Sequence, residues 1–433
     1  MSTAELLMDQ DDIDWFITAT LENDLLTTFG EDDRDLGICP YITFYVYNQP
    51  NEYMQVAEKM HALFDEFSLL IDEPWQKKWK DITQVWLKAG DKRLPDDWRP
   101  AAIRSQARGR VHFMRATDAS GPMVSPRWGI SGVVDEGYRC YSTLKLTFRH
   151  KWFNQNKERW YAFVEHCLNV LQPEHCYSGF EVGNGGFNLM GAYEADVLER
   201  ICADYFYGMD IDHPDAMGFQ YHGNENGYVS HLRLGAGLRT PTWSFLLSPL
   251  WRSRLGKTEA EVREFLNDPR IQITALPYPV GPHNPNAENA LWIRLGELDL
   301  YPVAQGLPDL LIKANELIKP IRCDELQLLT LDPWDDDPNP RFDYESSLRW
   351  MRRFDENSDW PSPEIRQPLL TASVDNSLQS GRCPANSPCL ETGYWYTPAK
   401  QNSRALFKQG ELMPNFPGSS YGATIWYWDG NQD

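Results

Sequence analysis

The sequence predicts an α+β protein in which a largely antiparallel or mixed sheet is covered by helices. Segments rich in β-branched and aromatic residues occur in runs with helical segments between them, and this order is typical of α+β domains. The helical segments carry apolar residues three and four positions apart, which indicates one face packed against a sheet. With 433 residues, 42% of them hydrophobic, the chain can bury a large core and is expected to form more than one packed unit.

The sequence of the first third of the chain predicts two helices and four strands. Residues 1–36 are acidic and predict helix, and GICPYITFYVYN (37–48) predicts a buried strand. A helix follows at 52–71, where the apolar residues recur at helical spacing. Three further strands, which suit a meander, are predicted at 109–117, 128–134 and 142–149.

The middle of the chain continues the mixture of helices and strands. A helix is predicted at 154–172, capped by Asn154 or Asn156 and stopped by Pro173, with a strand at 177–182 after it. Further helices are predicted at 192–207, 242–255, 259–267 and 308–321, and further strands at 271–276 and 290–296.

The composition changes near residue 332, which predicts three parts. Residues 1–331 form the α+β domain. Residues 332–379 are a connector that is acidic and rich in proline, as in DPWDDDPNPRFDYESS, with a short helix at SSLRWMRRF. Residues 380–433 form a small module of aromatic residues and strands.

The net charge of −21, from 62 acidic and 41 basic residues, restricts the partners. Such a surface repels phosphate backbones and anionic membranes, and it attracts a basic protein. Acidity for solubility alone is the alternative explanation. The sequence contains no run of about twenty apolar residues, and its start has no signal-peptide pattern. We therefore expect a cytoplasmic protein that binds neither nucleic acid nor membrane.

The eight cysteines are scattered and form no CxxC pair, so we expect most of them to be reduced and buried. Cys383 and Cys389 provide too few ligands for a structural zinc site. They are expected to pack together, or to form a strained disulfide under oxidation. Two His–Cys neighbours, His166–Cys167 and His175–Cys176, are interpreted as buried structural residues.

The stretch GMDIDHPDAM contains Asp210, Asp212, His213 and Asp215 within six positions. Carboxylates and an imidazole at this spacing could bind a cation. The calcium-loop pattern is broken, however, and the histidines and cysteines that zinc prefers are too few. Aspartates also accept backbone N–H bonds in turns. We therefore expect a structural turn here and no metal or cofactor.

The stretch GSSYG places Ser420 in the letter pattern of a nucleophile elbow. The strand–serine–helix context that an elbow needs is missing, because a proline loop precedes it and a strand-like ATIWYW follows. Without a convincing nucleophile, base or metal motif, the chain is predicted to be a binding protein and not an enzyme. A hydrolase using Ser420, or using Asp210, Asp212 and His213 as a metal site, is the alternative.

Several segments in a fixed order carry a family resemblance. They are RWGISGVVDEGY, STLKLTFRHKWF, HCYSGFEVGN, YGMDIDHPDAM, GAGLRTPTWSFLLSPLWRSRLG and ALWIRLGE. Over roughly residues 35–325, the chain resembles the type VI secretion immunity family, of the kind that protects against VRR-type nuclease toxins. The C-terminal part of the chain looks like a module common in type VI associated immunity-like proteins. The segments that carry this likeness are LRWMRRFDENSDWP, RCPANSPCLETGYWYTP, SRALFKQGELMPNFPG and YGATIWYW.

The resemblance implies a non-enzymatic cytoplasmic protein that binds and neutralises a cognate secreted toxin, most often a basic nuclease. It supplies no catalytic or binding residue. From the residues alone, the predicted partner contacts are two acidic clusters and one aromatic anchor, with a solvated surface as the alternative for each. An adaptor that loads a toxin for secretion is a further alternative function. The predicted contacts are Asp11, Asp12, Asp14, Trp334, Asp335, Asp336 and Asp337.

Overall fold

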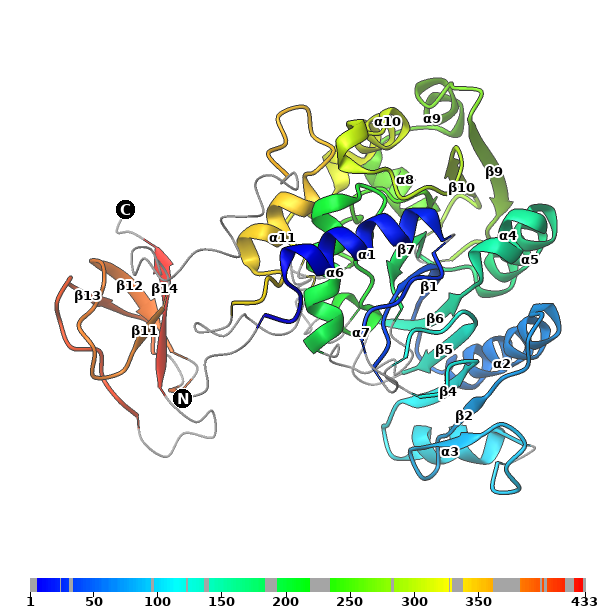
Figure 1. The fold of residues 1–433 in the computed structure, drawn as a ribbon, viewed down its shortest axis with the longest axis horizontal. Helices are drawn as coiled ribbons and strands as arrows, with labels where there is room; N and C mark the ends of the chain where they lie inside the picture. The colour runs from blue at the N-terminus through cyan, green and yellow to red at the C-terminus, as the bar shows by residue number, and fades with distance from the viewer. Residues whose placement is uncertain are drawn as a thin grey trace. The chain divides into compact units, whose positions relative to one another are not determined.

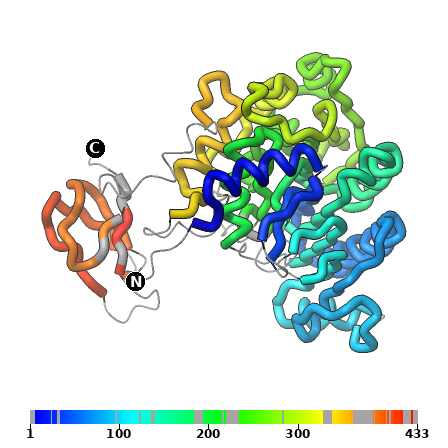
Figure 2. The backbone as a smooth tube through the Cα atoms, viewed as in Figure 1, coloured from blue at the N-terminus to red at the C-terminus, as the bar shows by residue number. Residues whose placement is uncertain are grey.

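The computed structural model describes most of the chain, and its backbone trace is shown in Figure 2. The described residues are 6–23, 25–30, 34–94, 97–121, 124–135, 140–183, 193–218, 234–281, 284–326, 328, 338–360, 382–397, 399–400, 403–416 and 424–430. The chain separates into two compact units, Met1–Leu370 and Thr371–Asp433.

The first unit is built on a ten-stranded sheet with the order β3-β2-β4-β5-β6-β1-β7-β8-β10-β9 (Figure 1). Each pairing between neighbouring strands is antiparallel, so the predicted fold class and the β4–β5–β6 meander are confirmed. The strands are β1 (Ile38–Tyr47), β2 (Lys77–Lys80), β3 (Val85–Lys88), β4 (His112–Thr117), β5 (Gly129–Val134), β6 (Tyr141–Thr147), β7 (His175–Val182), β8 (Ser244–Leu247), β9 (Ile271–Pro277) and β10 (Asn289–Leu295).

Strand β1 lies inside the sheet between β6 and β7, with Thr43 opposite both Lys145 and Tyr177. All of its residues except the last are buried, because helices cover the sheet on both faces. Figure 1 shows α2 and α5 on one side of these strands and α6 on the other. The helices of the first unit are α1 (Gln10–Glu22), α2 (Tyr53–Leu70), α3 (Arg99–Ala107), α4 (His150–Gln155), α5 (Lys157–Leu171), α6 (Tyr193–Tyr205), α7 (Pro214–Met217), α8 (Pro249–Leu255), α9 (Glu259–Phe265), α10 (Asp309–Ile318) and α11 (Tyr344–Met351).

Helix α1 begins at a capping box. The side chain of Asp9 accepts a hydrogen bond from the backbone N–H of Asp12, and the carboxylate of Asp12 accepts one from the backbone N–H of Asp9. The helix is much shorter than the predicted 1–36, because it ends at Glu22 and the chain then forms an antiparallel bridge between Phe29 and Leu36.

Two predicted helices are corrected by the structure. The predicted helix at 154–172 is two helices, α4 and α5, which meet at Asn156. Asn156 is the N-cap residue of α5, as predicted. Its side chain, however, donates to the carbonyl of Trp152 and closes α4, so it makes no side-chain cap bond to α5. The predicted helix at 242–255 is strand β8 followed by α8, with Pro249 in the first turn of α8.

One aromatic cluster holds α2 and α5 against the sheet. Phe67 of α2 contacts the rings of Trp75, Trp128, Trp160 and Phe163 at centroid distances of 5.8 to 6.4 Å. Such contacts add packing and ring electrostatics to the burial of apolar area. None of the helices in the described ranges has both the length and the apolar character needed to cross a membrane.

The second unit contains a four-stranded sheet with the order β11-β14-β12-β13. Its core consists of two cysteines, two tryptophans and a methionine: Cys383, Cys389, Trp395, Met413 and Trp426. Helix α11, within the predicted connector, contributes Trp350 and Met351 to the core of the first unit. The predicted boundaries at 331 and 379 stay predictions. The strands are β11 (Arg382–Pro384), β12 (Gly393–Tyr396), β13 (Ala405–Phe407) and β14 (Ile425–Gly430).

Candidate functional site

Two aspartates of GMDIDHPDAM, Asp210 and Asp212, are held by an arginine inside the protein. Arg239 is fully buried. Its Nη1 donates to Asp212 Oδ1 at 2.7 Å, and its Nη2 donates to Asp210 Oδ2. The guanidinium also lies 4.4 Å from the centre of the Tyr177 ring. The chain therefore supplies its own cation to both carboxylates.

Strand β1 supplies hydroxyl donors to the same carboxylates. Thr43 Oγ1 donates to Asp212 at 2.6 Å, the Tyr45 hydroxyl donates to Asp212 at 2.8 Å, and the Tyr41 hydroxyl donates to Asp210. These three residues alternate along the strand, so their side chains project from the same face. The buried carboxylates are thus held by both hydrogen bonds and charge.

Lys145 of β6 extends this network from Asp212 to Glu181 of β7. Its Nζ lies 3.2 Å from Asp212 Oδ2 and 2.5 Å from Glu181 Oε2. Burial opposes ionisation of Asp212, but Lys145 and Arg239 together lower its pKa. For Glu181 the balance is reversed, because burial outweighs the attraction of Lys145 and raises the pKa to about 8.

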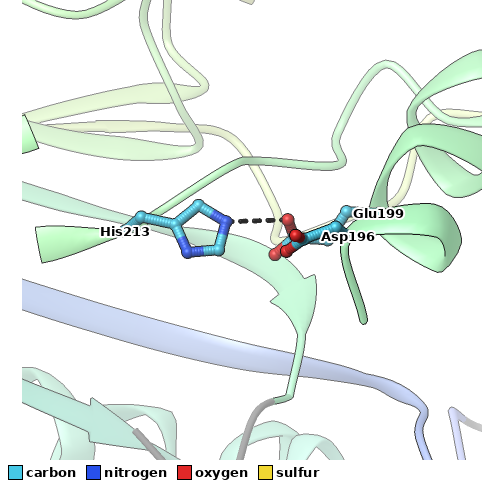
Figure 3. Close-up of side chains that lie close together, drawn as sticks. All are labelled: Asp196, Glu199 and His213. Carbon is cyan, nitrogen blue, oxygen red and sulfur yellow. Dashed lines mark hydrogen bonds and ion pairs between the residues drawn. The ribbon is translucent and has the colours of Figure 1, made fainter. Parts of the chain in front are cut away.

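His213 points away from this network to helix α6. Its Nε2 lies 2.8 Å from Glu199 Oε2, and Figure 3 shows its imidazole facing the carboxyl groups of Asp196 and Glu199. In the described part of the chain, these are the three His, Cys, Asp or Glu side chains whose ligand atoms come close enough to share a metal ion. The alternative metal site of Asp210, Asp212 and His213 is therefore wrong, because both aspartates are already bound to Arg239.

The group of Asp196, Glu199 and His213 combines two buried carboxylates with a mostly buried imidazole. Asp196 and Glu199 are 4% and 3% exposed, and the His213 side chain is 17% exposed. Burial alone would lower the pKa of His213, but the Glu199 carboxylate outweighs it and raises the pKa to about 9. Burial raises the pKa of Asp196 to about 6, against the opposing effect of His213. The Oδ1 atom of Asp196 is buried and has no hydrogen-bond partner among the described residues.

Of the four residues in the two His–Cys pairs, three are buried and one, His166, is exposed. Cys167, His175 and Cys176 are buried as predicted, and burial raises the pKa of both thiols well above the usual value, as for inert structural cysteines. His166 contradicts the prediction, because its side chain is 47% exposed and lies 3.1 Å from Glu66. Cys383 and Cys389 are buried in the core of the second unit.

The acidic cluster at the start of the chain lies on the outer face of α1. Asp11, Asp12 and Asp14 are exposed, and Trp15 beside them is 54% exposed. Trp15 also lines a hollow of about 590 Å³ between α1, the Phe29–Leu36 bridge and α6. The other lining residues are Leu7, Thr28, Phe29, Gly30, Arg34, Leu36, Glu194 and Leu198.

Trp15 is not among the predicted contact residues, although its position on α1 indicates that it is exposed. Ile13, Phe16 and Ile17 form the buried face of α1, and at 100° per residue Trp15 falls outside that face. A large aromatic ring in that position is an exposed apolar group beside acids. The second predicted cluster, Trp334, Asp335, Asp336 and Asp337, lies outside the described residues, as does Ser420.

The fold is similar to that of a solved bacterial protein that is named as part of a type VI secretion system (T6SS). The structure of the Pseudomonas aeruginosa T6SS protein PA0821 matches with a TM-score of 0.58 and 15% sequence identity, over 82% of this chain and 95% of that one. At this identity the similarity establishes a shared fold. No protein-family model matches the sequence, and neither does any curated protein sequence.

Proposed function

We propose that this protein is an immunity protein of a type VI secretion system, which binds a cognate secreted toxin in the cytoplasm and neutralises it. The observation that carries the proposal is the fold shared with a protein named as belonging to that system, over 95% of its length. The resemblance of the segments between residues 35 and 325 to type VI immunity proteins supports it independently. The role requires binding and no catalysis.

The net charge of −21 supports a basic toxin as the partner. Opposite charges accelerate encounter and select against wrong partners. A nuclease has a basic surface where it meets the phosphate backbone. The toxin proposed is therefore a nuclease, of the VRR type that the sequence resemblance implies.

The outer face of α1 is the proposed toxin contact. Exposed Asp11, Asp12 and Asp14 provide charge, and Trp15 provides a large apolar ring at the edge of a hollow. Tryptophan is enriched among the residues that dominate binding energy, and acids around it exclude wrong partners more than they add affinity. Leu21, also on α1, is 49% exposed and adds a second exposed apolar side chain to this helix.

The test begins with the protein as bait in extracts of its own cells, followed by identification of the retained protein and reconstitution of the pair. We expect a basic toxin at near-equal stoichiometry, whose activity falls to background when one equivalent of this protein is added. Growth of cells producing the toxin should be restored by co-production of this protein. A bound toxin that stays fully active would contradict immunity and would point to an adaptor for secretion.

Trp15→Ala locates the contact once the pair is reconstituted. We expect affinity to fall by roughly 30-fold, equivalent to about 2 kcal/mol, the threshold for a dominant interface residue. Leu69→Ala is the matched control, because Leu69 is 81% exposed on α2 and should leave affinity unchanged. Equal affinities for both variants and the unchanged protein would remove α1 from the interface.

A further inference from the structure

Asp196, Glu199 and His213 converge from two successive elements, helix α6 and the residue before α7. Asp196 and Glu199 are three residues apart on α6, so they share one face of the helix. His213 is the residue immediately before α7. One ligand atom from each of the three lies within 4.8 Å of the others, and Figure 3 shows the three side chains facing one another.

His213 and Glu199 bond to each other, but one oxygen of the third side chain, Asp196, has no partner among the described residues. Asp196 Oδ1 is buried and has no hydrogen-bond partner among the described residues, although a buried carboxylate oxygen normally has one. Arg341 attracts Asp196 electrostatically, and Glu194 repels it. The unpartnered oxygen belongs to a side chain that is 4% exposed and faces a second carboxylate and an imidazole.

A divalent cation satisfies all three side chains at once. With a neutral imidazole, the two carboxylates carry two negative charges, which such an ion cancels. Carboxylate oxygens and imidazole nitrogens bind zinc at about 2.0–2.2 Å, so two ligand atoms in tetrahedral coordination lie roughly 3.4 Å apart. The ligand atoms of the three side chains lie within 4.8 Å of one another, so side-chain rotations would draw them together around the ion.

We propose that Asp196, Glu199 and His213 bind one borderline divalent metal ion, with Zn²⁺ as the first choice. The mixture of oxygen and imidazole ligands favours a transition-metal ion. Calcium is disfavoured, because it takes six to eight oxygen ligands. The partly exposed edge of His213, 17% accessible, provides the entry path. The ion would tie α6 to the segment before α7, a role that is independent of the proposed function.

The first test measures metal binding by the full chain after treatment with EDTA and dialysis. Calorimetric titration with Zn²⁺ should give one ion per chain, and repeating it in buffers of different ionisation enthalpy should reveal proton release, because the metal replaces a proton on His213. The melting temperature should rise with Zn²⁺ concentration. Absence of stoichiometric binding of both Zn²⁺ and the spectroscopic probe Co²⁺ would overturn the proposal without the need for any variant.

Variants then assign the site. Asp196→Asn and Glu199→Gln keep side-chain shape and remove charge. Each should weaken Zn²⁺ binding by at least about 10- to 100-fold, the loss caused by removing even an outer partner of a ligand. His166→Gln is the control, because His166 pairs with Glu66 on the surface and should leave binding unchanged. Binding that is lost in His166→Gln, or retained in the two α6 variants, would overturn the assignment.

Discussion

Arg239 and Asp212 form an ion pair inside the first unit, with Arg239 Nη1 2.7 Å from Asp212 Oδ1 and both side chains fully buried. The two residues are 27 positions apart in the chain. Because Arg239 also binds Asp210, one cation holds two of the aspartates in the stretch that resembles a metal motif. Burial of these charges is tolerated only while each keeps its partners.

Replacing Arg239 with methionine should therefore be strongly destabilising. The change leaves two carboxylates buried without their cation, so we expect the free energy of unfolding to fall by roughly 3–5 kcal/mol. Urea denaturation followed by fluorescence measures it. Arg263→Met is the matched control, because the Arg263–Glu259 pair of α9 is 41% and 32% exposed and should contribute less than about 1 kcal/mol. Similar losses in the two variants would contradict the structural role of Arg239.

The acidic face of α1 should accelerate toxin association. In the triple variant Asp11→Asn, Asp12→Asn, Asp14→Asn, we expect the association rate at low salt to fall by about tenfold, with a smaller difference at high salt because ions screen exposed charges. Stopped-flow or surface-based kinetics with the reconstituted toxin measures this rate.

The control for this effect removes the same number of charges from other exposed positions. Glu264, Glu316 and Glu356 are exposed acids outside α1, and their replacement by glutamine changes the net charge equally. The α1 variant should slow association more than this control does. Equal rates for the two triple variants would show that net charge alone steers the toxin.

Acid should destabilise the first unit through His175. Burial lowers the pKa of His175 to about 4, although Glu174 partly opposes it. The unfolded chain binds this proton near pH 6.5 and the folded chain only near pH 4, so stability from this group is present above pH 6.5 and is lost as the pH falls toward 4. Between pH 7 and pH 5 the loss should be about 2 kcal/mol. His175→Gln should lack this component in urea titrations at the two pH values, and an unchanged pH dependence would contradict the assignment.

Much of the fold follows from local sequence patterns. The strand at 37–48 and the helix at 52–71 were predicted within a few residues of β1 and α2, because long apolar patterns report the period of the backbone. The segment SFLL lies in the predicted helix at 242–255 but forms strand β8, since a four-residue apolar run has no period of its own. Its pairing with β7 and β10 decided its conformation.

The candidate site was harder to predict than the fold, because its partners are distant in the sequence. The stretch GMDIDHPDAM shows which charged residues are present, but it does not show which residues they bind. His213 bonds with Glu199, fourteen positions earlier, and Asp212 with Arg239. No pattern of one helix or strand encodes such pairs. Only packing of α6 against β7 and the chain after it brings them together.

Loss of Trp426 should unfold the second unit without unfolding the first. Trp426 is 2% exposed, its Nε1 donates to the Pro414 carbonyl at 2.8 Å, and its ring contacts Phe407 edge to face. Trp426→Ala should cost about 3–5 kcal/mol, comparable to all that a core in a unit of this size supplies. Alkylation of buried Cys383 and Cys389 under native conditions reports the unfolding.

The first unit provides an internal control in the same alkylation experiment, because Cys167 and Cys176 are buried there. In Trp426→Ala, alkylation of Cys383 and Cys389 should rise by at least about tenfold, since a loss of 1.4 kcal/mol already opens a fold ten times more often. Cys167 and Cys176 should stay protected. Tyr396→Ala removes a half-exposed ring from the same small sheet and should change neither pair. Equal exposure of all four thiols in Trp426→Ala would mean that the two units unfold as one.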